Sequence, residues 1–137
     1  MNARPDISRD AASWVETAEN DLRNAEHTLT LKERCPYDTI CFHAQQCAEK
    51  YLKAFLISKS QDFQRIHDLQ LLLQLALPVS ALELQMAEVT ALNRYAVEAR
   101  YPGDWEPITR AEAEEAVVTA RKVKKEIREH LPPDCVG

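Results

Sequence analysis

The stretch of sequence that decides the fold lies between residues 41 and 54 and reads Cys41-Phe42-His43-Ala44-Gln45-Gln46-Cys47-Ala48-Glu49-Lys50-Tyr51-Leu52-Lys53-Ala54. Its apolar residues recur at three- and four-residue steps, which places them on one stripe of an α-helix. With the flanking residues, the stripe comprises Ile40, Cys41, Ala44, Cys47, Ala48, Tyr51, Leu52 and Phe55. The sequence therefore predicts a helix over residues 37–58, with Asp38 able to act as its N-cap.

The same periodicity predicts four further helices, over residues 10–31, 68–77, 80–100 and 109–131, with prolines at most of the breaks between them. Ser80 and Thr109 can cap the last two, and Glu112 completes a capping box with Thr109. The chain has only two glycines, too few for a sheet with tight turns. We therefore predict an all-α fold, an up-and-down antiparallel bundle of five helices in which the third is short.

Length and composition favour one domain over residues 1–137, with its core over about 10–131. Hydrophobic residues make up 45% of the 137 residues, enough for one core. The net charge of −5 argues against a protein that coats nucleic acid without specificity. No apolar run reaches the roughly 18 residues needed to span a bilayer, and the N-terminus lacks the apolar stretch of a secretory signal. We expect a cytoplasmic protein.

The four cysteines do not indicate a metal or redox site. No two of them form a Cys-x-x-Cys pair, and Cys41 and Cys47 lie among apolar residues, as small core side chains do. Glycine-rich phosphate loops and clustered metal ligands are also missing from the sequence. We therefore expect neither a metal nor a cofactor.

Four polar residues of the helix over residues 37–58 lie away from its apolar stripe. At 100° per residue they share one face, and they are His43, Gln46, Lys50 and Lys53. Two lysines and a histidine suit an anionic phosphate, and a glutamine can read a base edge or a ribose. The alternative is an ordinary solvated helix face.

Polar residues also interrupt the helix expected over residues 80–100. Asn93 and Arg100 point the same way two turns apart, and Arg100 can either satisfy carbonyls and carboxylates nearby or face a phosphate in a cleft. His67 precedes the short helix, where it can titrate near neutral pH or hold the loop to the bundle by a hydrogen bond. The sequence leaves these alternatives open.

A run of basic residues lies in the last expected helix and consists of Arg121, Lys122, Lys124, Lys125 and Arg128. It suggests a nucleic-acid surface. However, Glu112, Glu114 and Glu115 open the same helix, and acid at the N-terminus with base at the C-terminus is what the helix dipole favours. A role in stability is enough to explain the run.

Three blocks, in this order, resemble the HEPN domain family: His-Ala-Gln-Gln at 43–46, His-Asp-Leu at 67–69 and Ala-Arg-Tyr-Pro at 99–102. The resemblance spans about residues 14–131. It implies a four- or five-helix bundle, commonly a homodimer, that acts with a minimal nucleotidyltransferase partner in a toxin–antitoxin-like pair. It also implies a ligand site formed by His43, Gln46, Lys50 and Lys53, with Arg100 and Tyr101 at one end.

Catalytic members of this family are metal-independent ribonucleases in which a histidine follows an arginine after four to six residues. Arg100 matches the arginine, but Trp105, Glu106 and Pro107 stand where the histidine is expected. The incomplete motif therefore favours a non-catalytic nucleotide- or RNA-binding protein. A ribonuclease toxin that uses Arg100 with His43 or His67 is the first alternative, and a structural dimer or adaptor without ligand is the second.

The homodimer expectation rests partly on the family. It rests also on Phe42 and Ile57, two apolar residues that helical spacing places on the outer side of the helix over residues 37–58. Single exposed apolar residues are common on protein surfaces, so the pattern alone does not define an interface.

Overall fold

The computed structural model describes residues 5–63, 65–96 and 106–136, with side chains from residue 7 onward. It contains the helices α1 (Pro5–Thr28), α2 (Tyr37–Ser58), α3 (Leu69–Ala76), α4 (Met86–Thr90), the 3₁₀ turn η1 (Ala91–Tyr95), α5 (Arg110–Glu129) and α6 (Pro133–Val136). No strand occurs in these ranges. The predicted all-α bundle is confirmed: α4 and η1 together form its fourth helical segment.

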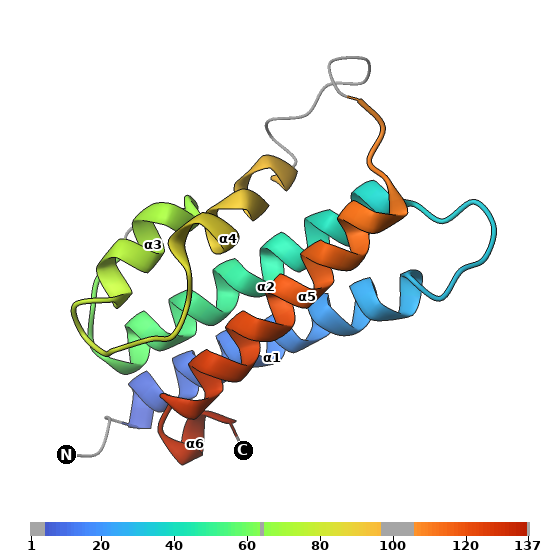
Figure 1. Cartoon of the computed structure of the whole chain (residues 1–137). Coiled ribbons are helices and arrows are strands. Elements are labelled where there is room, and N and C mark those ends of the chain that lie inside the picture. Colours follow the sequence, from blue (N-terminus) through green and yellow to red (C-terminus); the bar gives the residue numbers. More distant parts are fainter. Residues whose placement is uncertain (1–4, 64, 97–105, 137) are drawn as a thin grey trace.

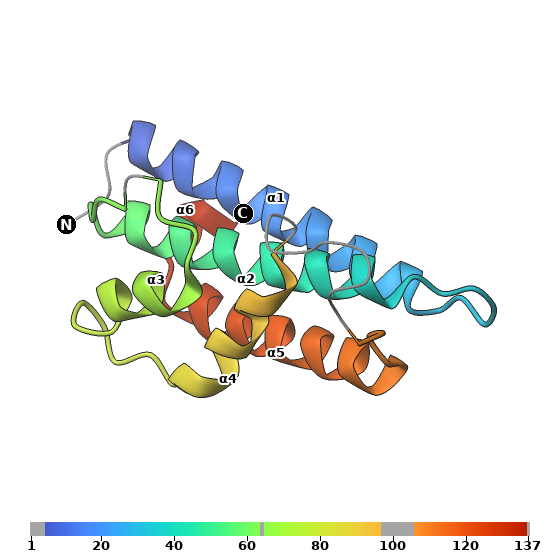
Figure 2. The ribbon, with the colours of Figure 1, turned by 90° about the horizontal axis from the view of Figure 1, so that it is seen from above.

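Three long helices, α1, α2 and α5, run side by side (Figure 1). The chain goes out along α1 and back along α2, returns through α3, α4 and η1, and comes back again along α5. Consequently α2 and α5 point the same way, and α1 runs antiparallel to both. Seen from above, α2 lies between α1 and the layer of α3 and α4 (Figure 2), and it contacts α1, α3, η1 and α5.

The apolar stripe of α2 forms the centre of the core. All eight of its residues, from Ile40 to Phe55, are fully buried. Each large side chain buried in this way stabilises the fold by about 1.5–3 kcal/mol. Partners come from α1 through Val15, Ala18, Leu22 and Ala25, and from α5 through Ala113, Ala116, Val117, Ala120, Val123 and Ile127.

Of the three predicted helix caps, Thr109 is confirmed, whereas Asp38 and Ser80 do not cap a helix. Thr109 caps α5, because its hydroxyl accepts a hydrogen bond from the Glu112 N–H at 3.1 Å. The predicted capping box is not closed, because the Glu112 carboxylate accepts from the Tyr95 hydroxyl of η1 at 2.9 Å. Pro36 is the N-cap residue of α2, and Asp38 bonds only the N–H of its neighbour Thr39.

The fourth helical segment begins at Met86 instead of near residue 80. Leu82 is drawn into the core, 7% exposed, and the Glu83 N–H donates to the Glu126 carboxylate of α5 at 2.8 Å. Residues 81–85 are not helical and connect α3 to α4 along α5. The predicted C-terminal end near Arg100 falls outside the described residues. None of the helices in the described ranges is long and apolar enough to cross a membrane.

Candidate functional site

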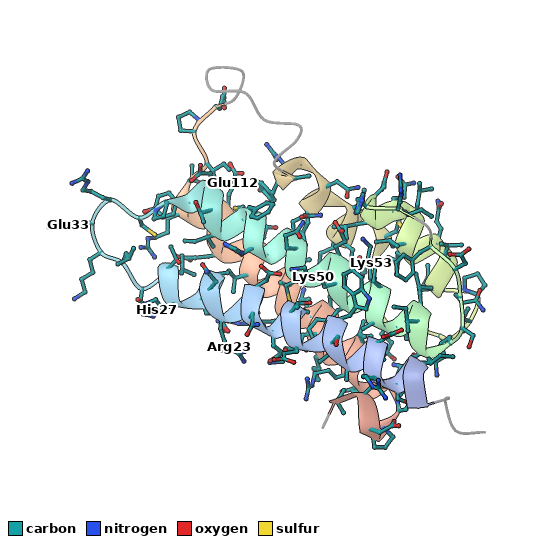
Figure 3. All side chains as sticks on the ribbon, turned by 180° about the vertical axis from the view of Figure 1, so that it is seen from behind. Arg23, His27, Glu33, Lys50, Lys53 and Glu112 are labelled. Atoms are coloured by element: carbon teal, nitrogen blue, oxygen red, sulfur yellow. The ribbon has the colours of Figure 1, made fainter. Side chains whose placement is uncertain are left out.

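The polar face of α2 is covered on one side by α1. Figure 3 shows Lys50 and Lys53 along this face, beside α1. It is not the freely solvated cationic strip that the sequence suggested, because two carboxylates reach its cations. Asp21 comes from α1 and Glu49 from α2 itself.

Asp21, His43 and Lys50 form a cluster that we call the Asp21 triad. One Asp21 oxygen lies 2.7 Å from Nδ1 of His43, and the other accepts a hydrogen bond from Nζ of Lys50 at 2.6 Å. The Asp21 side chain is 11% exposed, whereas those of His43 and Lys50 are 22% and 24% exposed. A nearly buried carboxylate thus holds two half-buried side chains in fixed positions.

The second cluster, the Glu49 cluster, consists of Gln45, Gln46, Glu49, Lys53 and His67. Its hydrogen bonds form a chain along α2: Gln46 donates to Gln45 at 2.7 Å, and Gln45 donates to Glu49 at 2.9 Å. The other Glu49 oxygen accepts from Lys53 at 2.9 Å and lies 3.0 Å from Nδ1 of His67. Three side chains therefore converge on one buried carboxylate.

Lys53 is buried, in contrast to the exposed position expected from its place on the helix. Only 3% of the residue is exposed, and its ammonium lies 5.3 Å from the ring centre of Trp14 and 5.6 Å from that of Phe63. The two rings pack edge to face. A charge removed from water needs a partner, and here a carboxylate and two aromatic faces supply it.

His67 holds its loop to α2, which was one of the two roles left open. Its Nδ1 lies 3.0 Å from Glu49 Oε2 and also 3.0 Å from Lys53 Nζ. Nδ1 carries either a proton or a lone pair, so it donates to Glu49 or accepts from Lys53, but not both at once. Next to it, Asp68 caps α3 and accepts from the Asn93 amide.

Glu49 stays ionised although it is almost buried. Burial acts to raise its pKa, but hydrogen bonds from Lys53, His67 and Gln45 outweigh that effect and leave the pKa below its ordinary value. Together with the carboxylate of Asp21, it balances the charges of the two lysines. The face then has no net charge unless a histidine is protonated, so a phosphate at Lys50 would lie beside the carboxylate that pairs with this lysine.

The predicted site residues differ in how accessible they are to a ligand. His43, Gln46 and Lys50 lie together and partly exposed, whereas Lys53 is buried behind them. Arg100 and Tyr101 lie outside the described residues. The structure of the described segments therefore brings together one group of three residues that a ligand can reach.

Asp21 and Glu49 are the residues that the sequence-based site missed. Asp21 lies three residues after Ala18 and four before Ala25, on the apolar stripe of α1. A carboxylate at such a position needs a cationic partner, so its placement was a usable signal. The partner itself could not be chosen from spacing.

The basic run of α5 is used to join helices. Arg121 pairs with Glu26 of α1, Lys124 with Glu19 of α1, and Lys122 with Glu88 of α4. A groove of about 480 Å³ lies along this side. These pairs agree with the role in stability. Among the described residues, no group of His, Cys, Asp or Glu side chains is arranged to hold a metal ion.

Three comparisons relate the chain to known proteins. The sequence profile of the HEPN domain matches residues 11–130. The chain is similar to the crystal structure of TT1696 from Thermus thermophilus, with 32% identity, a TM-score of 0.73, and coverage of 88% of this chain and 98% of that one. It also shares its fold with ST0689, an archaeal HEPN homologue, at 22% identity and a TM-score of 0.69, over 89% and 98% of the two chains. No curated protein gives a significant match.

Proposed function

The chain belongs to the HEPN domain family, and from that premise we propose that it is a non-catalytic nucleotide- or RNA-binding protein. We propose further that it acts with a minimal nucleotidyltransferase partner in a toxin–antitoxin-like pair. The observation that carries the binding proposal is the Asp21 triad beside Gln46, on the partly exposed face of α2. Residues held in advance by a buried carboxylate lose little conformational freedom when a ligand binds.

Each residue of this face has bonding capacity left for a ligand. Lys50 uses one N–H on Asp21, and its ammonium has three. His43 is bonded through Nδ1, and its Nε2 has no partner among the described residues. We assign Lys50 to a ligand phosphate, and His43 with Gln46 to the base or ribose. Arg100 and Tyr101 are proposed as further contacts on sequence grounds alone.

Nucleotide binding is tested by fluorescence anisotropy with a labelled mononucleotide and a labelled short oligoribonucleotide. We expect binding that weakens as salt rises, because phosphate contacts release counterions, and a loss of about tenfold or more in Lys50→Ala. Lys125→Ala, a change on α5 away from this face, serves as the matched control and keeps wild-type affinity. If neither probe binds the wild type at millimolar concentration, the protein is an adaptor without ligand.

The Asp21–His43 contact favours one alternative function, a ribonuclease toxin. A carboxylate bonded to Nδ1 orients a histidine so that Nε2 can act as a general acid or base. Glu49 holds Nδ1 of His67 in a similar way. The test is to incubate RNA with the protein in the presence of a metal chelator and to look for cleavage. Cleavage that disappears in both His43→Ala and Arg100→Ala supports the ribonuclease and overturns the non-catalytic proposal.

The partner is tested by co-expression. If a gene for a small nucleotidyltransferase lies beside this one, its product should co-purify with this chain at a fixed ratio. Toxicity on expression of this chain alone, relieved by that product, would support the paired role. Absence of both effects would remove the nucleotidyltransferase proposal while leaving the binding proposal intact.

A further inference from the structure

In the Glu49 cluster, the charge of Glu49 decides which atom donates and which accepts in each hydrogen bond between Glu49, Gln45 and Gln46. An ionised carboxylate only accepts hydrogen bonds, so the Gln45 atom that lies 2.9 Å from Glu49 Oε1 must be its amide nitrogen. Gln45 is 1% exposed, so water does not compete for its amide group. Its carbonyl oxygen therefore faces away from Glu49, toward Gln46.

The orientation of Gln46 follows from that of Gln45. The Gln45 carbonyl accepts at 2.7 Å, so the Gln46 atom on it must be the amide nitrogen. Because the amide nitrogen of Gln46 is bonded to Gln45, its carbonyl oxygen points toward the exposed side of the face, where a ligand would bind. Gln46 is half-buried, and its Oε1 has no hydrogen-bond partner among the described residues. The charge of Glu49 thus fixes, through Gln45, which atom of Gln46 a ligand meets.

His43 presents a second acceptor on the same face, one helical turn from Gln46. Asp21 accepts from Nδ1, which places the proton of a neutral imidazole on Nδ1 and leaves a lone pair on Nε2. Acceptors on Gln46 and His43 match a ligand group that donates hydrogens. Lys50 lies one turn beyond Gln46 and carries the positive charge.

We propose that Gln46 accepts a hydrogen bond from the exocyclic amine of a nucleobase, so that the site prefers adenine and cytosine to their keto counterparts, hypoxanthine and uracil. The inference rests on the proposed nucleotide-binding function. An exocyclic amine donates to the Gln46 carbonyl, whereas a carbonyl in the same place faces it oxygen to oxygen. A site that loses a paired hydrogen bond in this way rejects the analogue.

The test compares the affinities of AMP with IMP and of CMP with UMP. In each pair an amine is exchanged for a carbonyl oxygen, and the neighbouring ring nitrogen gains a proton. The wild type should bind the amino compound about tenfold more tightly, the worth of one partly exposed hydrogen bond and the unpaired group left without it. In Gln46→Met the ratio should fall to about one. Gln45→Met frees the Gln46 amide to turn over, and should lower the ratio while Lys50-dependent binding persists.

Gln74→Met, an exposed change on α3, is the matched control and keeps the wild-type ratio. Equal affinity of the wild type for AMP and IMP, with binding still dependent on Lys50, overturns the inference and leaves the proposed function standing. A preference that survives in Gln46→Met also overturns it. Failure of all four nucleotides and of the short oligoribonucleotide to bind at millimolar concentration overturns both proposals.

Discussion

Asp21 is a carboxylate on the core-facing side of α1 whose two oxygens serve two side chains of α2. Glu49, on α2 itself, bonds Gln45 through one oxygen and contacts both Lys53 and His67 through the other. Each carboxylate is nearly buried, so each would be costly without its partners. These two residues turn a cationic helix face into two neutral clusters and fix the side chains that a ligand meets.

Asp21→Asn should lower the free energy of unfolding by about 1–3 kcal/mol, because two half-buried side chains lose a charged acceptor. The measurement is denaturant unfolding at pH 7. Asp10→Asn is the matched control on the exposed side of the same helix and should stay within about 0.5 kcal/mol of wild type. Equal effects of the two changes would show that the triad contributes nothing to stability.

The Glu49 carboxylate makes stability depend on acid pH. Its pKa lies below the ordinary 4.5 in the folded protein, so the unfolded chain binds the proton more tightly. The stabilisation is therefore complete above that ordinary value and is lost as the pH falls through the lower folded-state pKa.

Glu49→Gln should accordingly be less stable than wild type at neutral pH, and the difference should shrink below about pH 4. Unfolding curves recorded from pH 7 to pH 3 check this, with Glu16→Gln on the exposed face of α1 as the control for loss of one charge. A difference that stays constant over the range would contradict the assignment of Glu49 as an ionised acceptor.

At the scale of the element, helix ends are built by specific residues. Beyond the end of α2, Ser60 takes a positive φ of 56°, and its N–H bonds Ile57 O while that of Gln61 bonds Leu56 O. This pair of hydrogen bonds is a Schellman motif, in which glycine is preferred at the position of Ser60. At the start of α5, the Thr109 hydroxyl supplies the cap.

Ser60→Gly should raise the free energy of unfolding by about 0.5–1 kcal/mol, because glycine takes the left-handed conformation without the clash of a Cβ atom. Ser58→Gly changes the last residue of α2, in helical conformation, and should lower stability by a similar amount. Thermal and denaturant unfolding measure both. A destabilised Ser60→Gly variant would show that the serine side chain outweighs the backbone strain.

Thr109→Ala should lower the free energy of unfolding by about 1 kcal/mol, since the Glu112 N–H loses its acceptor at the start of α5. Thr17→Ala, at an exposed position within α1, is the control and should not destabilise the protein. Chemical denaturation of the two variants side by side is sufficient. Equal stability of the two would mean that solvent replaces the cap without cost.

At the scale of the whole molecule, ion pairs and hydrogen bonds between helices hold the bundle in register around α2. Arg121 and Lys124 join α5 to α1, and Arg110 donates to the carbonyls of Leu29 and Leu31 that follow α1. The two residues predicted for a dimer surface are less exposed than expected. Ile57 packs against the core, and Phe42 is half-buried and packs on His43. The homodimer expectation therefore rests mainly on the family.

We expect multi-angle light scattering at micromolar concentration to give about twice the chain mass of 15.6 kDa. Phe42→Asp tests whether α2 contributes to the interface, because a buried charge there should dissociate the dimer. Asp62→Ala, in the exposed loop after α2, is the control. A wild-type mass near that of one chain would refute a stable homodimer.

The sequence alone predicted the all-α fold, a helix over residues 37–58 and the buried stripe of that helix. Apolar periodicity reflects contacts between residues three and four apart, so it can be read locally. The family also followed from it, through motifs spread over most of the chain. The fourth helical segment was misjudged at its start because the tie of Glu83 to Glu126 spans 43 residues.

The state of the polar face of α2, in contrast, depends on contacts between distant segments. His43 and Lys50 find their carboxylate 22 and 29 residues away, and Lys53 is buried by Trp14, from another helix, and by Phe63, from a loop. Such contacts depend on the rotation and height of one helix against its neighbour. Residue spacing along a single helix gives no information about the rotation or the height of a neighbouring helix. The sequence therefore revealed the cations of this face but not the carboxylates that neutralise them.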